Sequence, residues 1–241
     1  MRVAIASSSS VGAPILESLV NSNHVPGFVL ANIDRPKGRG LNVERNDFAA
    51  LADRHGLKVF QPDKNLTIEK ILADNPIDLI VTVGFGHLIR KEALNIPTFG
   101  WMNIHFSLLP RWRGASPVQQ SILHGDRLTG ITYFKLNEGL DTGPIYYQST
   151  VPLKGDETTS SLLSQLSGKA SGELLHVLDL IEKGKIPEEQ PFEGVTLAPK
   201  LSKADGTING LMSAVRTEAL IRALKDNPGV TLQINGNRLR I

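Results

Sequence analysis

The alternation of apolar and polar positions along the chain predicts short strands separated by helices. Apolar runs typical of strands cover residues 2–6, 28–33, 57–60 and 77–83. Between them, apolar residues at helical spacing cover residues 14–20, 46–55 and 66–73. The run at 77–83 is apolar at nearly every position, which is typical of a strand in a parallel sheet covered on both faces. This repeated order predicts an α/β fold with a doubly wound, mostly parallel sheet.

The second half of the chain continues with longer elements. Its patterns predict strands at 130–136 and 144–153 and helices at 118–123, 158–183 and 211–224. At the end, the runs 230–234 and 238–241 flank Asn235-Gly236, a signal for a tight hairpin. A lone hairpin is marginally stable in water. We therefore expect this one to pack on the main domain, to pair with another chain, or to be disordered.

Composition limits the class of protein. No apolar run approaches the roughly 20 residues that cross a bilayer, and the N-terminus lacks the pattern of a secretory signal peptide. The chain has no cysteine, so we expect no disulfide framework. Together with the missing membrane span and signal-peptide pattern, this predicts a cytoplasmic location and no membrane partner. The net charge of +2 is nearly neutral, so any nucleic-acid site must come from local clustering of charge.

The stretch 103–117 begins like a buried strand and ends like the entrance to a helix. Asn103 and His105 lie two positions apart, so an extended strand directs both side chains to one face. Pro110 ends the strand, Arg113-Gly114 predicts a turn, and Ser116-Pro117 predicts an N-cap followed by proline at the first helical position. The polar pair therefore lies near a strand's carboxyl end, where open α/β sheets bind ligands.

An amide and an imidazole on one face suit acyl-type transfer, because the amide can donate to an oxyanion while the imidazole moves a proton. An isolated Asn-x-His pattern is more often a capped strand end with a hydrogen-bonded histidine. A carboxylate downstream favours catalysis: Asp141 lies between Gly139 and Gly143, and glycines let backbone approach a ligand closely.

Several motifs together resemble the formyltetrahydrofolate-dependent formyltransferase family over residues 2 to about 225. They are Asn103-x-His105-x-Ser107-Leu108-Leu109-Pro110 with Arg113-Gly114 and Pro117, then Gly130-Ile131-Thr132, then Gly139-Leu140-Asp141-Thr142-Gly143. Three further stretches, residues 34–40, 60–62 and 198–203, resemble the branch of the family that formylates the methionyl group of initiator tRNA.

The resemblance implies a Rossmann-like formyltransferase fold, 10-formyltetrahydrofolate as formyl donor and no metal. It implies that Asn103, His105 and Asp141 are catalytic. It also implies a folate pocket, formed by Phe85, Gly86, Leu88, Ile89, Ser107, Leu108, Leu109 and Pro110. His87 lies in the same region, and we expect it to face solvent or to cap the loop.

The segment 34–45 is rich in glycine and charge, and its pattern predicts a mobile loop. Charge runs of this kind are usually solvated loops. The resemblance instead assigns Arg35, Lys37 and Arg39 to contacts with tRNA phosphates. The serine-rich turn at residues 7–10 could likewise bind an anion at a helix start or simply be a polar turn.

The resemblance also implies a division into domains. We expect residues 1–203 to form the catalytic domain, and residues 204–241 to form a linker helix and a truncated remnant of the OB-type barrel that usually follows it. We expect a monomer.

Two other functions remain open. The same donor and the same three catalytic residues would serve a formyltransferase for a small amine, such as an amino-sugar nucleotide, or a hydrolase that uses water. A catalytically idle module that binds folate or tRNA is the third reading, which the intact Asn103, His105 and Asp141 disfavour.

Overall fold

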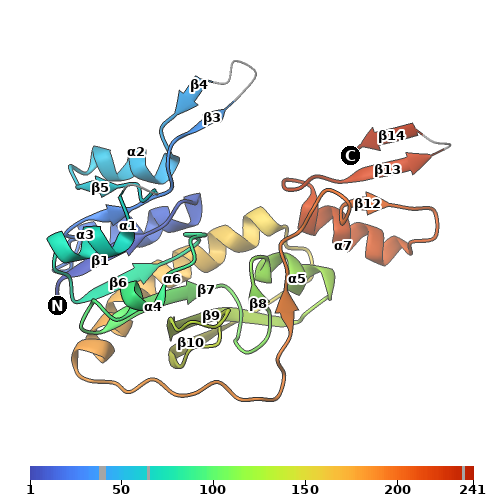
Figure 1. Cartoon of the computed structure of the whole chain (residues 1–241). Coiled ribbons are helices and arrows are strands. Elements are labelled where there is room, and N and C mark those ends of the chain that lie inside the picture. Colours follow the sequence, from blue (N-terminus) through green and yellow to red (C-terminus); the bar gives the residue numbers. More distant parts are fainter. Residues whose placement is uncertain (38–41, 64–65, 235–236) are drawn as a thin grey trace. The chain divides into compact units, whose positions relative to one another are not determined.

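A computed structural model describes residues 1–37, 42–63, 66–234 and 237–241, with backbone alone at 37, 42 and 238 (Figure 1). The helices are η1 (Ser10–Gly12), α1 (Ala13–Val20), α2 (Asp47–Arg54), α3 (Ile68–Asp74), α4 (Lys91–Leu94), α5 (Pro117–Leu123), α6 (Thr159–Glu182) and α7 (Ala214–Leu224). The strands of the main sheet are β1 (Val3–Ala6), β2 (Val29–Leu30), β5 (Val59–Phe60), β6 (Leu79–Thr82), β7 (Gly100–His105), β9 (Leu128–Lys135) and β10 (Ile145–Pro152). The remaining strands are β3 (Arg35–Lys37), β4 (Asn42–Glu44), β8 (Arg113–Gly114), β11 (Leu197–Ala198), β12 (Thr207–Ile208), β13 (Thr231–Ile234) and β14 (Asn237–Arg240).

The main sheet has seven strands in the order β10-β9-β7-β6-β1-β2-β5. From β5 to β7 every pairing is parallel. The chain starts at β1 in the middle, extends to β2 and β5 on one side, and then crosses over to β6 and β7 on the other. This order confirms the predicted doubly wound α/β fold, and it brings the carboxyl ends of β1, β6 and β7 to one edge of the sheet.

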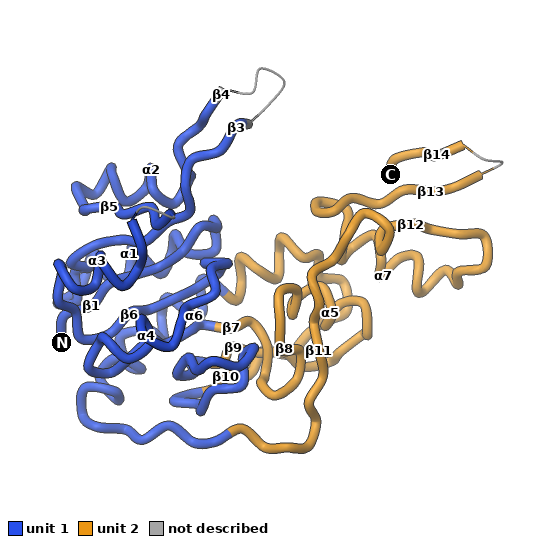
Figure 2. Tube along the Cα trace, in the orientation of Figure 1, with its two compact units in different colours: residues 1–104, 133–147, 167–189 blue, residues 105–132, 148–166, 190–241 orange. Residues whose placement is uncertain are grey.

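The chain divides into two compact units that interleave along the sequence (Figure 2). Unit 1 contains residues 1–104, 133–147 and 167–189, and unit 2 contains residues 105–132, 148–166 and 190–241. The expected division into a catalytic domain at 1–203 and a C-terminal remnant at 204–241 stays a prediction.

Buried apolar strands form the core of unit 1. All four residues of β1 and all four of β6 are buried, as the continuous apolar runs predict. Trp101 on β7 is fully buried, and its indole N–H donates to the carbonyl of Ala93 at 2.9 Å. On α6, the hydroxyls of Ser167 and Ser171 donate to the carbonyls of Val11 and Pro14 at 2.5 and 2.8 Å. These bonds fasten η1 and the first turn of α1 to the long helix.

Two local predictions were wrong, and a third, the N-cap of α5, is confirmed in its position but lacks the capping bond. Arg113-Gly114 is not a simple turn, because it forms β8, which pairs in parallel with β11. The segment expected as a mobile loop contains a hairpin, in which Arg35 of β3 faces Glu44 of β4. Ser116 occupies the N-cap position of α5 without a capping hydrogen bond, since its hydroxyl donates to the carbonyl of Pro199 instead.

The C-terminal hairpin predicted at 230–241 is confirmed, with β13 and β14 antiparallel. It is not alone, because β12 adds a parallel strand alongside β13. Helix α7 precedes it and is tied to the start of α6: Arg222 donates to the carbonyl of Glu157 at 2.9 Å, and Thr159 donates to the carbonyl of Ala223 at 2.7 Å. Across the described ranges, we find no helix whose length and apolar character would let it cross a membrane.

The loop that carries Asp141 closes tightly onto the end of β9, which gives a test of the fold. A Cβ added at Gly143 would lie 1.7 Å from the carbonyl oxygen of Lys135, so Gly143→Ala must displace backbone. We expect a loss of about 1–3 kcal/mol in the free energy of unfolding, measured by thermal and denaturant unfolding.

The matched control is Gly172→Ala on α6, where an added Cβ meets nothing within 4 Å. This substitution should stabilise the protein by about 0.5–1 kcal/mol, since alanine favours a helix over glycine. A Gly143→Ala protein at least as stable as wild type would contradict the described loop.

Candidate active site

Asn103 lies at the carboxyl end of β7, directly opposite Thr82 at the end of the parallel strand β6. The Thr82 hydroxyl donates to the Asn103 side-chain oxygen Oδ1 at 2.6 Å, and Thr82 is only 3% exposed. With Oδ1 as the acceptor in this bond, Nδ2 is left as the donor side of the amide. The sequence analysis did not single out Thr82. A hydroxyl residue at the end of an otherwise apolar run is the signal that could have found it.

His105 is the last residue of β7, and its two-residue spacing from Asn103 gives both side chains the same face of the strand. It is 6% exposed, and its Nε2 lies 2.8 Å from the carbonyl oxygen of Trp112. A carbonyl oxygen can only accept a hydrogen bond, so Nε2 carries a proton and donates it. In the neutral imidazole the lone pair is then on Nδ1.

The segment from Ser107 to Pro110, predicted to bind folate, is held by hydrogen bonds within unit 2. The Thr132 hydroxyl donates to the carbonyl of Ser107 at 2.7 Å and accepts from the backbone N–H of Leu109 at 3.1 Å. The Gln148 amide donates to the carbonyl of Leu109 at 2.9 Å. Ser107 is fully buried, with its hydroxyl bonded to the carbonyl of Arg111 at 2.6 Å. Its side chain therefore shapes the loop.

Asp141 lies in the loop between β9 and β10, in the same unit as Asn103. Its backbone is left-handed, with φ of 50°, a conformation that asparagine and aspartate tolerate better than most residues. Asn137 orders the loop by accepting from the Gly139 N–H at 3.0 Å and from the Thr142 hydroxyl at 2.9 Å. The structure thus gives Asp141 a defined position, while its interaction with His105 stays a prediction.

The second part of the predicted folate pocket follows β6 in unit 1. Phe85 and Ile89 are buried at 5% and 8% exposure, whereas Leu88 is 88% exposed. Gly86 has φ of 73°, a left-handed conformation that favours glycine. The ring of His87 stacks on Phe85 with centroids 4.6 Å apart. Burial, and next the positive charge of Arg35, hold the pKa of His87 below its ordinary value.

The serine-rich turn is used for packing at its first two positions. Ser7 is fully buried, and Ser8 accepts a hydrogen bond from the backbone N–H of Asn32 at 2.8 Å through its hydroxyl. An anion site in this turn stays a prediction.

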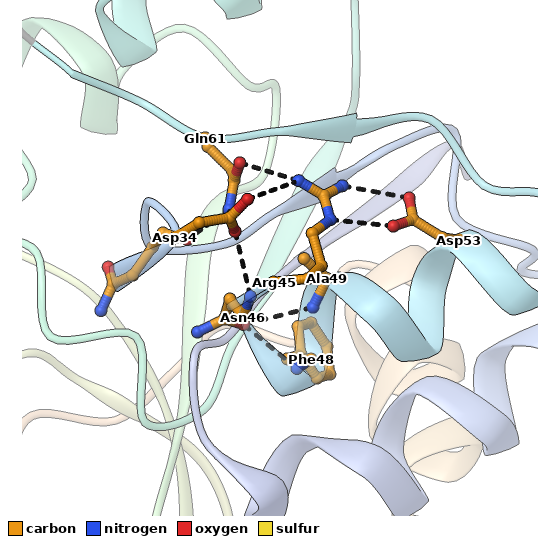
Figure 3. A network of polar contacts seen from close by, with 8 residues as sticks. Asp34, Arg45, Asn46, Phe48, Ala49, Asp53 and Gln61 are labelled. Atoms are coloured by element: carbon orange, nitrogen blue, oxygen red, sulfur yellow. Dashed lines mark hydrogen bonds and ion pairs between the residues drawn. The ribbon is translucent and has the colours of Figure 1, made fainter. Parts of the chain in front are cut away.

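A network of polar contacts anchors the base of the hairpin that carries Arg35 (Figure 3). Arg45 binds both carboxylate oxygens of Asp53, at 2.9 and 3.1 Å, and donates to Gln61 at 2.8 Å. Asp34 accepts from the Gln61 amide at 2.6 Å and from the backbone N–H of Asn46 at 3.0 Å. Gln61 belongs to one of the stretches that carry the sequence resemblance, and its role here is to hold the hairpin.

A cleft of about 250 Å³ lies beside this network. Its lining residues are Ser8, Asn32, Ile33, Arg35, Glu44, Arg45, Asn46 and Asp47. Of the three cations predicted to bind tRNA, Arg35 borders the cleft, while the Lys37 side chain and Arg39 lie outside the described residues. Among the residues that the structure describes, no group of three or more His, Cys, Asp and Glu side chains is arranged to hold a metal ion.

The Asp34 carboxylate provides a pH-dependent test of this network. Hydrogen bonds from Gln61 and from the Asn46 backbone hold the pKa of Asp34 below its ordinary value. The ionised carboxylate therefore stabilises the fold above the unfolded pKa of about 3.9, and this contribution is lost as pH falls through the folded value.

Asp34→Asn should accordingly reduce the free energy of unfolding at pH 7 by up to about 1 kcal/mol, because a solvent-exposed pair is screened. The difference between wild type and variant, measured by denaturant unfolding, should shrink below about pH 4. An equal difference at pH 7 and pH 3 would argue against a stabilising charge at Asp34.

Comparison with known proteins places this site in context. A family model described as "Formyl transferase" matches residues 1–178. A methionyl-tRNA formyltransferase of Salinispora tropica is 40% identical over 245 residues, which cover 100% of this chain and 79% of the relative. One of Acidothermus cellulolyticus is 40% identical over 242 residues, which cover 99% of this chain and 75% of the relative.

Solved structures agree on the fold. A methionyl-tRNA formyltransferase from Clostridium thermocellum matches with a TM-score of 0.70 and 21% identity, over 100% of this chain and 91% of that one. An N-formyltransferase from Helicobacter canadensis, in complex with folinic acid and dTDP-3-aminofucose, matches with a TM-score of 0.72 and 19% identity, over 98% of this chain and 85% of that one. At such identities the likeness concerns the fold alone.

Proposed function

The chain belongs to the formyl transferase family and, within it, to the methionyl-tRNA formyltransferases; on this premise we propose that it formylates the amino group of methionyl-initiator tRNA. The donor is folate-derived, and we assign it as 10-formyltetrahydrofolate. The observation that carries the proposal is the hydrogen bond from the Thr82 hydroxyl to Asn103 Oδ1, which leaves Nδ2 as the donor side of an amide two residues before His105 on β7.

The reaction requires one new bond and one broken bond. The neutral methionyl amine attacks the formyl carbon, the C–N bond forms, and the formyl oxygen becomes an oxyanion. Asn103 Nδ2 donates to that oxyanion, in the manner of an oxyanion hole. When the tetrahedral intermediate collapses, the bond from the formyl carbon to folate N10 breaks and N10 takes up a proton. The attacking nitrogen loses one proton and N10 gains one, so the products are the formylated amine and tetrahydrofolate, with no net release of a proton.

His105 and Asp141 manage the protons in this scheme. Because Nε2 of His105 donates to the Trp112 carbonyl, Nδ1 is the ring atom that delivers a proton towards N10. Asp141 orients the imidazole and takes a proton from the attacking amine, directly or through water. An α-amino group has a pKa of about 7.7–8.0, so a carboxylate or a water molecule is a sufficient base.

The remaining residues are assigned to binding either the formyl donor or the tRNA acceptor. Phe85, Gly86, Leu88 and Ile89, with Ser107, Leu108, Leu109 and Pro110, form the folate pocket in this proposal. Arg35, Lys37 and Arg39 contact the tRNA backbone in this proposal. The contacts of Arg45 with Asp53 and Gln61 fix the base of the hairpin that carries Arg35.

A small amine, such as an amino-sugar nucleotide, is a weaker candidate for the acceptor. The relatives that are 40% identical over essentially the whole chain are methionyl-tRNA formyltransferases. The sugar-related structure is only 19% identical and supports the fold alone. A tRNA acceptor therefore accounts better for the sequence.

Asn103→Ala should slow formyl transfer by about 10²-fold or more, because loss of one oxyanion donor costs on the order of 3 kcal/mol. The measurement is steady-state transfer from 10-formyltetrahydrofolate to charged initiator tRNA. Asn21→Ala is a matched control, since the Asn21 side chain is exposed and donates to the carbonyl of Glu17 in the same helix region. A loss of less than about tenfold would remove Asn103 from this role.

Arg35→Gln should raise KM for charged tRNA while KM for the folate stays unchanged, because a phosphate contact acts only on the acceptor. The slope of log(kcat/KM) against log[salt] should become shallower by about one unit, the share of one phosphate contact. Lys183→Gln serves as control, because Lys183 is an exposed lysine directly after the end of α6, paired with Asp179. An unchanged salt slope in Arg35→Gln would contradict the assigned contact.

A further inference from the structure

A carboxylate in unit 2 binds two side chains next to the catalytic motif. Asp126 follows α5, and its side chain is 12% exposed. One of its oxygens accepts from the indole N–H of Trp112 at 2.7 Å. The same carboxylate receives the Arg111 guanidinium through bonds of 2.6 and 3.1 Å, and that guanidinium lies 4.2 Å from the Trp112 ring centroid. Asp126 thus holds the indole and the cation stacked on it in one arrangement.

The backbone of Trp112 is constrained as well. Its φ of 65° is left-handed, which is uncommon for a large residue without special support. Support comes from Thr196: its hydroxyl accepts from the Trp112 N–H at 2.8 Å, and its carbonyl accepts from the Arg113 N–H at 2.9 Å. The ring of Trp112 also contacts the imidazole of His124, with centroids 4.6 Å apart.

The carbonyl of this constrained residue is the one that receives Nε2 of His105 at 2.8 Å. Trp112 is 5% exposed and His105 is 6% exposed, so water has little access to compete for the bond. The position of the carbonyl decides both the rotation of the imidazole and the nitrogen that keeps its proton.

We propose that Asp126 is a positioning residue for His105, acting through the indole and the left-handed backbone of Trp112. Its carboxylate is paired with the Arg111 guanidinium, so the two charges largely cancel, and the effect on His105 is geometric. Thr196 supports the same carbonyl from the backbone side. The catalytic consequence of this inference rests on the proposed formyl transfer, whereas its geometric part does not.

The inference predicts a change in kcat with little change in KM. Asp126→Leu keeps a side chain of similar size but accepts no hydrogen bond, so the Trp112 carbonyl loses its fixed position. We expect kcat for formyl transfer to fall by between about tenfold and 100-fold, the effect of a small misplacement of a reacting group. KM for both substrates should stay near that of wild type.

Nitrogen NMR on histidine-labelled protein provides a readout that does not require activity. In wild type, neutral His105 should show a protonated Nε2 and an unprotonated Nδ1. In Asp126→Leu the Nε2-protonated and Nδ1-protonated forms of His105 should interconvert, so that the two ring nitrogens give averaged resonances. Asp126→Asn keeps one acceptor for the indole and should give an intermediate kcat. Glu218→Gln, which removes a carboxylate from Arg222 on α7, should match wild type in both measurements.

Unchanged kcat together with the single Nε2-protonated form in Asp126→Leu would overturn the proposal. If that variant does not fold, Asp126→Asn and Thr196→Val carry the test, and wild-type kcat and tautomer in both would overturn it. If Asp126→Leu lowers stability and leaves the tautomer of His105 unchanged, the role of Asp126 is purely structural and the proposal is also overturned. If wild type fails to formylate methionyl-tRNA, the proposed function fails, but the NMR result still decides whether Asp126 positions His105.

Discussion

A single hydrogen bond between two parallel strands, from the Thr82 hydroxyl to Oδ1 of Asn103, leaves Nδ2 as the donor side of the amide that we propose to be catalytic. The bond depends on the register of β6 and β7, which runs from Leu79 opposite Gly100 to Thr82 opposite Asn103. That register is fixed by two strands that are buried almost throughout. A shift by one residue would move Asn103 to the other face of the sheet. The burial of β6 and β7 therefore fixes the register that places Thr82 opposite Asn103, and this contact leaves Nδ2 of Asn103 as the donor.

The tautomer of His105 is likewise set by a single hydrogen bond. Its proton-bearing nitrogen is chosen by a backbone carbonyl, so no charged partner is needed to define the tautomer. Groups fixed before the substrate arrives need no reorganisation during the reaction, which is the main source of electrostatic catalysis in enclosed sites. In contrast, the hairpin that we assign to the acceptor is anchored by exposed charges around Arg45. Binding there should respond to salt far more than the chemical step does.

Local sequence patterns predicted most of the elements and failed where partners are distant. Periodicity located α1, α2, α6 and the buried strands to within a few residues. The pairing of Arg113-Gly114 with Leu197-Ala198 joins segments far apart in the chain, and no local pattern encodes it. Ser116 has the composition of an N-cap, yet a distant carbonyl takes its hydroxyl. For the candidate site, the motif predicted Asn103 and His105, whereas the bonds from Thr82 to Asn103 and from Trp112 to Asp126 are tertiary contacts that only the fold provides.

The most direct test of this account is a crystal structure of the protein with a non-reactive folate that carries a formyl group. We expect the formyl oxygen to lie about 2.7–3.2 Å from Nδ2 of Asn103, with Oδ1 still bonded to the Thr82 hydroxyl. A formyl group directed away from Asn103, or an amide turned so that Oδ1 faces the ligand, would contradict the proposed origin of catalysis.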